Sequence, residues 1–243
     1  MMTLEEKVRV PSSIYYVVEV RNLFKRFEDE IVLRDISFFV RDKEKVVLFG
    51  HNGSGKTTLI RCLLGFENFD GEINLFGQNI NENTSFKHQI GYVPQVHPMM
   101  PYDVGDFVKF AVIAKRSNIK DFENICNSFN LKFASVAKKK INDLSGGMRQ
   151  KIFLSLALLN NPKILFLDEP FSNLDIQSQL RLSDILKNLN CTQIISTHRI
   201  EDVYFADRVI YLQSGSIEAD LPREEFIKSF SFVLKKKWDG SQR

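Results

Sequence analysis

The residues best placed to do chemistry lie in one short glycine-rich run, residues 50–58. The run fits the P-loop pattern, which is a glycine, any four residues, and then Gly-Lys-Ser/Thr. An apolar, strand-like run precedes it and a helix-like run follows it. Glycines let the backbone turn its N–H groups inward around an anion, and the helix N-terminus adds a positive dipole. We therefore predict that a nucleotide phosphate is bound by Gly50, His51, Asn52, Gly53, Ser54, Gly55, Lys56, Thr57 and Thr58.

Two side chains of this loop have separate expected roles. Lys56 would reach the β- and γ-phosphates as a point charge. The hydroxyl of Thr57 would complete the ligand shell of a Mg²⁺ ion that keeps several waters. The competing interpretation is a glycine-rich turn with an incidental lysine, and the strand-loop-helix context disfavours it.

A pair of carboxylates follows a fully apolar run at residues 164–167. Phosphoryl transfer to water needs one carboxylate to hold Mg²⁺ through its water shell and a second to orient and deprotonate the attacking water. We assign the first role to Asp168 and the second to Glu169. Alone, Asp-Glu-Pro after a strand could be a helix-capping turn, but the P-loop upstream favours the catalytic interpretation.

A second helix N-terminus suited to an anion begins at Ser145. Gly146 and Gly147 follow it, so small residues and a hydroxyl stand where a phosphate could approach. The chain thus carries two surfaces for a γ-phosphate but a single P-loop. This combination favours a dimer, in which each copy completes the site of the other.

Composition and charge narrow the class of protein. With 243 residues, 44% hydrophobic and 26% charged, the chain is an ordinary globular protein. Its net charge of +3 is too small to favour nucleic acid as a partner.

No window of about 18 uncharged apolar residues exists, so no membrane-spanning helix is expected. Charged residues within residues 1–10 argue against a signal peptide, and the cytoplasm is the default location. The three cysteines are odd in number and widely spaced, so we expect reduced thiols.

Strand-like and helix-like runs alternate along most of the chain. Residues 15–20 and 31–40 are predicted strands because they are rich in β-branched and aromatic residues, and residues 21–30 are a predicted polar turn region. Further strands are predicted at residues 46–49, 71–77, 89–93, 164–167, 192–196, 208–213 and 216–219. Strands that alternate with helices indicate a parallel sheet covered on both faces, with active groups at the C-terminal ends of the strands.

The helix-like runs group into an insertion and a core set. Helices are predicted at residues 103–115, with Asp103 as the N-cap, and at 120–129, inside a helical insertion of about residues 96–143. Other helices are expected from Ser145, over residues 176–189, and in a short segment that begins at Pro222. We predict one domain over residues 1–243, with a loose lead-in at 1–14 and a basic tail at 235–243.

Together and in order, these motifs resemble the ATP-binding subunits of ATP-binding cassette (ABC) transporters, over about residues 16–230. Residues 50–58 match the family's Walker A motif, and residues 144–148, Leu-Ser-Gly-Gly-Met, match its signature sequence. Residues 164–168 match Walker B, with Glu169 at the catalytic position. Met148 departs from the family, because the signature often has glutamine there.

The resemblance implies roles for four more residues. Gln95 is similar to the Q-loop glutamine, which contacts Mg²⁺ and links the site to the helical insertion. Asp175 ends a segment similar to the D-loop, and His198 is similar to the switch histidine that contacts the γ-phosphate. Phe27 occupies the place of the aromatic residue that stacks on adenine, although a minor core contact is its alternative interpretation. The implied catalytic set is therefore Lys56, Gln95, Glu169 and His198, and the implied Mg²⁺ set is Thr57, Gln95 and Asp168.

The fold class that the resemblance implies is an α/β P-loop NTPase of ABC type. It has a mainly parallel sheet core, an N-terminal antiparallel β subdomain and a helical subdomain insertion. The implied ligands are ATP and Mg²⁺, and the implied function is ATP hydrolysis that powers transport of an unknown substrate. The implied partners are transmembrane permease subunits and a second copy of the chain or a paralogous ATPase subunit, which would hold it on the inner face of the cell membrane. The alternative is a soluble ABC-type ATPase that remodels a cytosolic assembly without a membrane partner.

Overall fold

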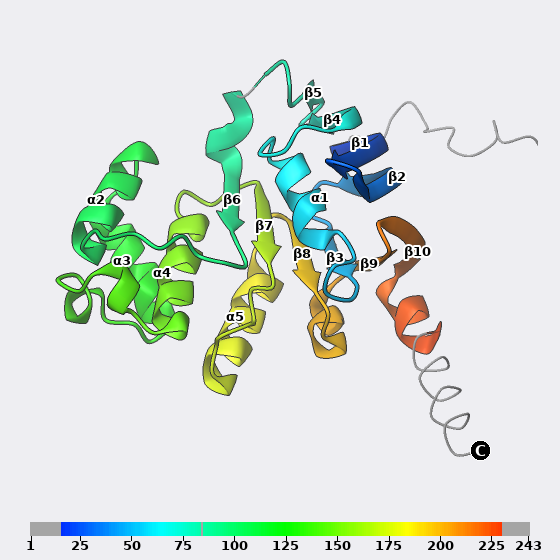
Figure 1. Cartoon of the computed structure of the whole chain (residues 1–243). Helices are drawn as coiled ribbons and strands as arrows, with labels where there is room; N and C mark the ends of the chain where they lie inside the picture. Colours follow the sequence, from blue (N-terminus) through cyan, green and yellow to red (C-terminus); the bar gives the residue numbers. More distant parts are fainter. Residues whose placement is uncertain (1–15, 84, 230–243) are drawn as a thin grey trace, which may run out of the picture.

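The computed structural model describes residues 16–83 and 85–229 (Figure 1). The predictions for residues 1–14 and 235–243 lie outside the described residues. Within the described part, no helix combines the length and the apolar character needed to cross a bilayer. The three cysteines are buried free thiols, as predicted, and burial raises the pKa of Cys62 to about 12 and those of Cys126 and Cys191 to about 11.

The central sheet has six strands in the order β10-β9-β3-β8-β7-β6. Five are parallel to their neighbours, and β10 runs antiparallel to β9 at one edge. The strands are β3 (Lys45–Phe49), β6 (Ile90–Val93), β7 (Ile164–Asp168), β8 (Thr192–Thr197), β9 (Arg208–Gln213) and β10 (Ser216–Pro222). The mainly parallel sheet that the alternating runs predicted is confirmed.

Both faces of this sheet are covered. Successive residues of a strand point to opposite faces, so Leu48 and Phe166 enter one hydrophobic core while Val47 and Leu167 enter another. The first core contains the apolar side of α1 (Lys56–Leu63), and the second contains that of α5 (Ile176–Asn188). Every residue of β7 and β8 is buried as a result. Burial on both faces explains the almost continuous apolar sequence of β7, whereas β8 buries polar residues on either side of Ile194 and Ile195.

A second, antiparallel sheet has the strand order β2-β1-β4-β5. Its strands are β1 (Tyr16–Phe27), β2 (Glu30–Arg41), β4 (Asp70–Leu75) and β5 (Gln78–Asn79). The predicted turn region at residues 21–30 is wrong, because β1 continues to Phe27 and only residues 28–29 turn. Register shifts in the β1–β2 pairing and a φ of 47° at Asn22 interrupt the strict alternation of the strand, so its polar residues do not show a strand pattern.

A helical lobe lies beside the β6 edge of the central sheet (Figure 1). It contains α2 (Val104–Ala114), α3 (Ile119–Ser128) and α4 (Gly146–Leu158), which share a third core around Val108, Phe122 and Ile152. Asp103 does occupy the N-cap position of α2, but its side chain makes no capping hydrogen bond. The N–H groups of Val104 and Gly105 donate instead to the carbonyls of Lys139 and Ala137, at 2.9 and 2.8 Å.

Short helical segments complete the chain. The 3-10 helices are η2 (Ser85–Gln89), η3 (Phe133–Ser135), η4 (Ile141–Asp143) and η5 (Ile200–Phe205). The prediction that the final helix begins at Pro222 is wrong. Pro222 ends β10, paired with Arg208, and the helix begins at Arg223. A proline at the end of an edge strand removes no hydrogen bond that the sheet needs.

Candidate functional site

Most of the predicted site residues lie at the C-terminal ends of four adjacent parallel strands, along one edge of the central sheet. β3, β8, β7 and β6 are neighbours in that order, and parallel strands end at the same edge. Directly after these strands come Gly50, His198, Glu169 and, two positions beyond β6, Gln95. Topology therefore brings together residues that are far apart in the sequence.

The glycine-rich loop leaves β3 and enters α1. Gly53 and Gly55 have φ angles of 80° and 101°, a region that glycine adopts without strain. A Cβ atom on Gly55 would also lie 2.7 Å from Leu33 Cδ2, so the close packing of the loop against β2 requires glycine. In the described part of the chain, the buried Ser54 Oγ has no hydrogen-bond partner, which leaves a hydroxyl free for a ligand.

Lys56, the first residue of α1, is buried within the loop. Its Nζ donates to the carbonyl oxygens of Gly50 and His51, both at 2.8 Å, and lies 3.8 Å from Glu169 Oε1. Burial lowers the pKa of Lys56, and the nearby Glu169 and Asp168 partly oppose this shift. An anionic ligand beside Nζ would supply the negative charge that favours the ammonium form.

Glu169 is buried directly after β7 and lies close to both Lys56 and His198. Its Oε1 lies 3.0 Å from His198 Nδ1 as well as 3.8 Å from Lys56 Nζ. The φ angle of Glu169 is 50°, a left-handed conformation that costs a non-glycine residue about 1–3 kcal/mol. Its N–H group donates to Ser196 Oγ at 3.0 Å, which helps to hold this conformation and aims the carboxylate at the loop.

Asp168 has one bound and one free oxygen. Ser196, its register partner on β8, donates to Oδ1 through its hydroxyl. The other oxygen, Oδ2, is buried and has no hydrogen-bond partner among the described residues. A buried carboxylate oxygen without a partner is costly unless a ligand satisfies it.

A pocket of about 170 Å³ unites most of the predicted phosphate residues. It is lined by Val32, Asn52, Gly53, Gly55, Lys56, Thr57, Thr58, Gln95 and Glu169. Its small volume and its mix of N–H donors, hydroxyls and charges suit a phosphate chain rather than a whole nucleotide.

Other predicted residues lie outside this pocket. Ser145 caps α4, where its Oγ accepts a hydrogen bond from the N–H of Met148 at 3.3 Å. Asp175 caps α5, where its carboxylate accepts from Ser178 N at 2.8 Å. Gly147 approaches the loop between them so closely that a Cβ atom would lie 3.0 Å from the carbonyl oxygen of Asn173.

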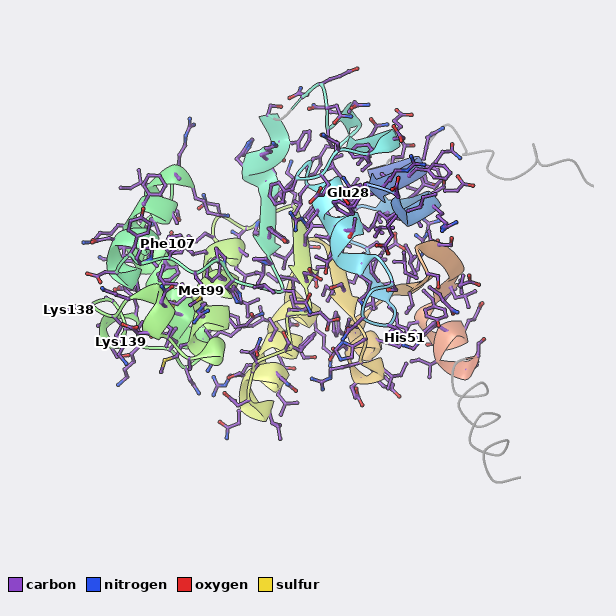
Figure 2. All side chains as sticks on the ribbon, viewed as in Figure 1. Glu28, His51, Met99, Phe107, Lys138 and Lys139 are labelled. Carbon is purple, nitrogen blue, oxygen red and sulfur yellow. The ribbon has the colours of Figure 1, made fainter. Side chains whose placement is uncertain are left out.

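The signature glycines and the segment 172–175 thus form one surface, separate from the phosphate pocket. The helical lobe extends even farther from the phosphate-binding loop. Lys138 and Lys139 of the lobe lie on the opposite side of the molecule from His51, which belongs to that loop (Figure 2).

Phe27 lies at the end of β1 and is 42% exposed. It does not line the phosphate pocket, so the predicted adenine platform lies outside that pocket. Its ring contacts a buried lysine, Lys25, whose Nζ lies 4.2 Å from the ring centroid.

Sequence reasoning missed residues that connect these parts. Gln150 of α4 is 1% exposed and donates to the carbonyl of Pro170 at 2.9 Å, which links the signature helix to the residue after Glu169. His97 follows the Gln95 loop and stacks on Phe153 of α4, with ring centroids 4.5 Å apart. Gln150 could have been noticed in the sequence, because it is a polar residue within an otherwise mostly apolar helical run. The sequence around His97 has no pattern that would have identified it.

The fold and the site define an ABC-type nucleotide-binding domain: a P-loop on a mainly parallel sheet, an adjacent Asp-Glu pair, an antiparallel β subdomain and a helical lobe. Comparison with known proteins agrees. A family model described as ABC transporter matches residues 33–172, more than half of the chain, and the chain belongs to this family.

Curated relatives include the spermidine/putrescine import ATP-binding protein PotA of Legionella pneumophila (strain Paris). It is 32% identical over 211 residues, which cover 83% of this chain and 58% of the relative. The chain therefore spans little more than half the length of that relative. The uncharacterized ABC transporter ATP-binding protein YdcT of Escherichia coli (strain K12) is also 32% identical, over 88% of this chain and 66% of the relative.

Solved structures support the same fold. The dimeric post-hydrolysis state of the ATP-binding cassette MJ0796, bound to ADP and Pi, superposes with a TM-score of 0.76 and 27% identity. The match covers 85% of this chain and 98% of that one. The predicted fold class, an α/β P-loop NTPase of ABC type, is confirmed.

Proposed function

We propose that this chain binds and hydrolyses ATP and powers transport across a membrane through transmembrane permease subunits. The observation that carries the proposal is the position of Glu169, which is buried at the phosphate pocket and 3.0 Å from His198 Nδ1. A buried carboxylate at the end of a strand, beside a phosphate cradle, is suited to accept a proton from an attacking water. Lys56 would bind the β- and γ-phosphates, and His198, whose Nδ1 lies 3.0 Å from Glu169 Oε1, would contact the γ-phosphate.

Mg²⁺ is the metal that fits this set of oxygen ligands. The free, buried Asp168 Oδ2 and the hydroxyl of Thr57 at the pocket wall are hard donors of the kind Mg²⁺ prefers, and Gln95 adds an amide oxygen. When bound, Mg²⁺ neutralises charge on the phosphates. Ser196 orients Asp168 for this role by donating to its other oxygen.

We further propose that two copies, or one copy and a paralogous subunit, close head to tail around ATP. The exposed Ser145 and Gly146 support this arrangement, because they are open to a partner and do not line the phosphate pocket of their own chain. The hydroxyl hydrogen of Ser145 remains available to a γ-phosphate, since its oxygen already accepts from Met148. Asp175 and Asn173 lie beside this surface and would meet the partner as well.

Transport is favoured over remodelling of a cytosolic assembly by the named functions of the relatives. PotA of Legionella pneumophila is named as an import subunit, which supports import as the direction. In this proposal the chain lies on the inner face of the membrane, held by its permease partners. The permease binds the cargo, so the identity of the cargo is set there and not in the cassette.

The test is the variant Glu169→Gln, studied as the purified full chain with Mg-ATP. We expect phosphate release to fall by about 100-fold or more, because the general base is lost while the amide keeps the hydrogen-bonding shape. ATP binding persists, so light scattering during size-exclusion chromatography should show a dimer. Glu218→Gln, an exposed glutamate on β10, is the matched control and should behave like the wild type. Unchanged hydrolysis would remove Glu169 from its role, and a purely monomeric variant would contradict the head-to-tail pair.

A further inference from the structure

Phe27 contacts a buried lysine of β1. Lys25 precedes it by two positions in β1, and the contact between the two side chains is direct although the pairing with β2 shifts register between Lys25 and Arg26. Lys25 Nζ lies 4.2 Å from the centroid of the Phe27 ring, a distance at which a cation is attracted to the face of an aromatic ring. Lys25 is 7% exposed and Phe27 is 42% exposed, so the ammonium lies over one face of the ring while much of the ring remains accessible.

The ammonium of Lys25 is fixed by groups other than Phe27. Nζ donates to the carbonyl oxygen of Asn68 at 2.8 Å and pairs with Glu67 Oε2 at 3.2 Å. The other oxygen of Glu67 pairs with Arg61 of α1 at 2.9 Å. A lysine that is both buried and doubly bound has little freedom, so it offers the ring a fixed surface.

We propose that Lys25 is a positioning residue for the nucleotide base. It holds one face of Phe27 so that the opposite face is already oriented to stack on adenine. The inference rests on the proposed function, in which ATP binds at the P-loop, and on the prediction that its base stacks on Phe27. A ring immobilised before binding avoids the ordering cost of an exposed side chain, and this gain appears as affinity for the base.

The same contacts tie the base platform to the phosphate cradle. Arg61 lies on α1, the helix that begins with Lys56, so the chain of contacts runs from Phe27 through Lys25, Glu67 and Arg61 to the P-loop helix. The base platform is therefore connected to α1 through Glu67, which lies in the segment between α1 and β4. This explains why a charged residue is buried at the end of an antiparallel strand.

The test compares two ligands, Mg-ATP and magnesium with inorganic tripolyphosphate, which lacks a base. Isothermal titration calorimetry measures both affinities in the wild type, Lys25→Met, Phe27→Ala and the double variant. We expect Lys25→Met to weaken ATP binding about three- to tenfold and to leave tripolyphosphate binding unchanged. We expect the double variant to match Phe27→Ala for ATP, because Lys25 acts through the ring. Lys25→Arg keeps a cation and should restore most of the affinity.

The matched control is Arg21→Met, which removes another cation from β1. The Arg21 guanidinium lies 5.6 Å from the ring of Phe39, away from the site, so neither affinity should change. The inference is overturned if Lys25→Met weakens both ligands equally, which would indicate general damage through Arg61 and α1, or if its effect adds to that of Phe27→Ala. If Phe27→Ala leaves ATP affinity intact, the base lies elsewhere and the inference fails while phosphate binding stands. If the wild type binds neither ligand, the proposed function fails as well.

Discussion

The two helix N-termini predicted to hold phosphate differ in what surrounds them. At α1, Lys56 and Glu169 have side chains that are each 5% exposed, and Asp168 lies beside them with a free oxygen. At α4, Ser145 and Gly146 are exposed, and the nearest loop contributes Asn173. The first N-terminus thus has a buried cation beside buried acids and a histidine. At the second, the exposed hydroxyl and N–H groups are accompanied by Arg149, which donates to the carbonyl of Leu144, and by the Lys151–Asp175 ion pair, whose carboxylate is exposed.

This difference indicates how the work is divided between the two surfaces. Backbone N–H groups and a hydroxyl can bind a phosphate oxygen, but they cannot move a proton. The α4 surface is therefore suited to sense the γ-phosphate and the α1 surface to bind and cleave it. Variants at the two surfaces should then fail in different ways, which makes the comparison testable.

The largest effect is expected at the α1 surface, in Lys56→Ala. ATP affinity should fall by about 100-fold, because the variant loses charge-assisted hydrogen bonds to two phosphates. Calorimetry with Mg-ATP measures the loss. Lys109→Ala removes an exposed lysine of α2 and serves as the control. Because the change also leaves Glu169 without its cation, thermal unfolding should be recorded, and an affinity that is unchanged in a folded variant would contradict the role of Lys56.

At the α4 surface, Ser145→Ala should show the opposite pattern. We expect ATP affinity of the isolated chain to stay within about twofold of the wild type, while phosphate release falls about tenfold, as for loss of one hydrogen bond to a charged group. Ser135→Ala changes another exposed serine of the helical lobe and should have no effect. A loss of ATP affinity equal to the loss of turnover would mean that Ser145 acts within its own chain.

A mixture of Lys56→Ala and Ser145→Ala chains tests whether the two surfaces meet in one site shared between two copies. Each mixed pair contains one site with the intact P-loop of one copy and the intact signature of the other. Phosphate release should therefore exceed the sum of the separate variants. Absence of any recovery, in chains that still associate, would contradict a site shared between copies.

The sequence predicted the parts of the site that depend on local pattern. Glycine spacing specified the P-loop, and the apolar run of β7 located the strand whose end carries Glu169, because a strand covered on both faces favours apolar residues. The signal for β8, which ends before His198, was weaker, since only Ile194 and Ile195 of its six residues are apolar. It did not predict contacts between distant segments. Three such contacts depend on how the elements pack, and no local pattern encodes them. They are the hydrogen bond from Ser196 to Asp168, the hydrogen bond from Gln150 to the carbonyl of Pro170, and the ion pair of Lys25 with Glu67. The extension of β1 to Phe27 was missed for the same reason, since strand pairing with an irregular register overrode a polar local sequence.

The smallest expected effect concerns His97, which lies where the two surfaces are joined. It follows the Gln95 loop of the α1 surface and stacks on Phe153 of α4. Burial, assisted by the nearby Arg149, lowers the pKa of His97 from 6.5 to about 4. Between pH 6.5 and pH 4, His97 binds a proton in the unfolded chain but not in the folded chain. The contribution of the neutral, buried His97 to folding stability is therefore fully present above pH 6.5 and is lost as the pH falls toward 4.

Replacing His97 with Phe should remove this dependence and keep the stack on Phe153. We expect the free energy of unfolding of the wild type to fall by about 1–3 kcal/mol more than that of His97→Phe between pH 7 and pH 4.5, as measured by urea denaturation. The ring nitrogen Nε2 has no hydrogen-bond partner in the described part of the chain, so Phe loses no bond there. His88→Phe, at an exposed position, controls for the loss of any histidine. If the two variants have the same pH profile, His97 is not the buried group that links stability to pH here.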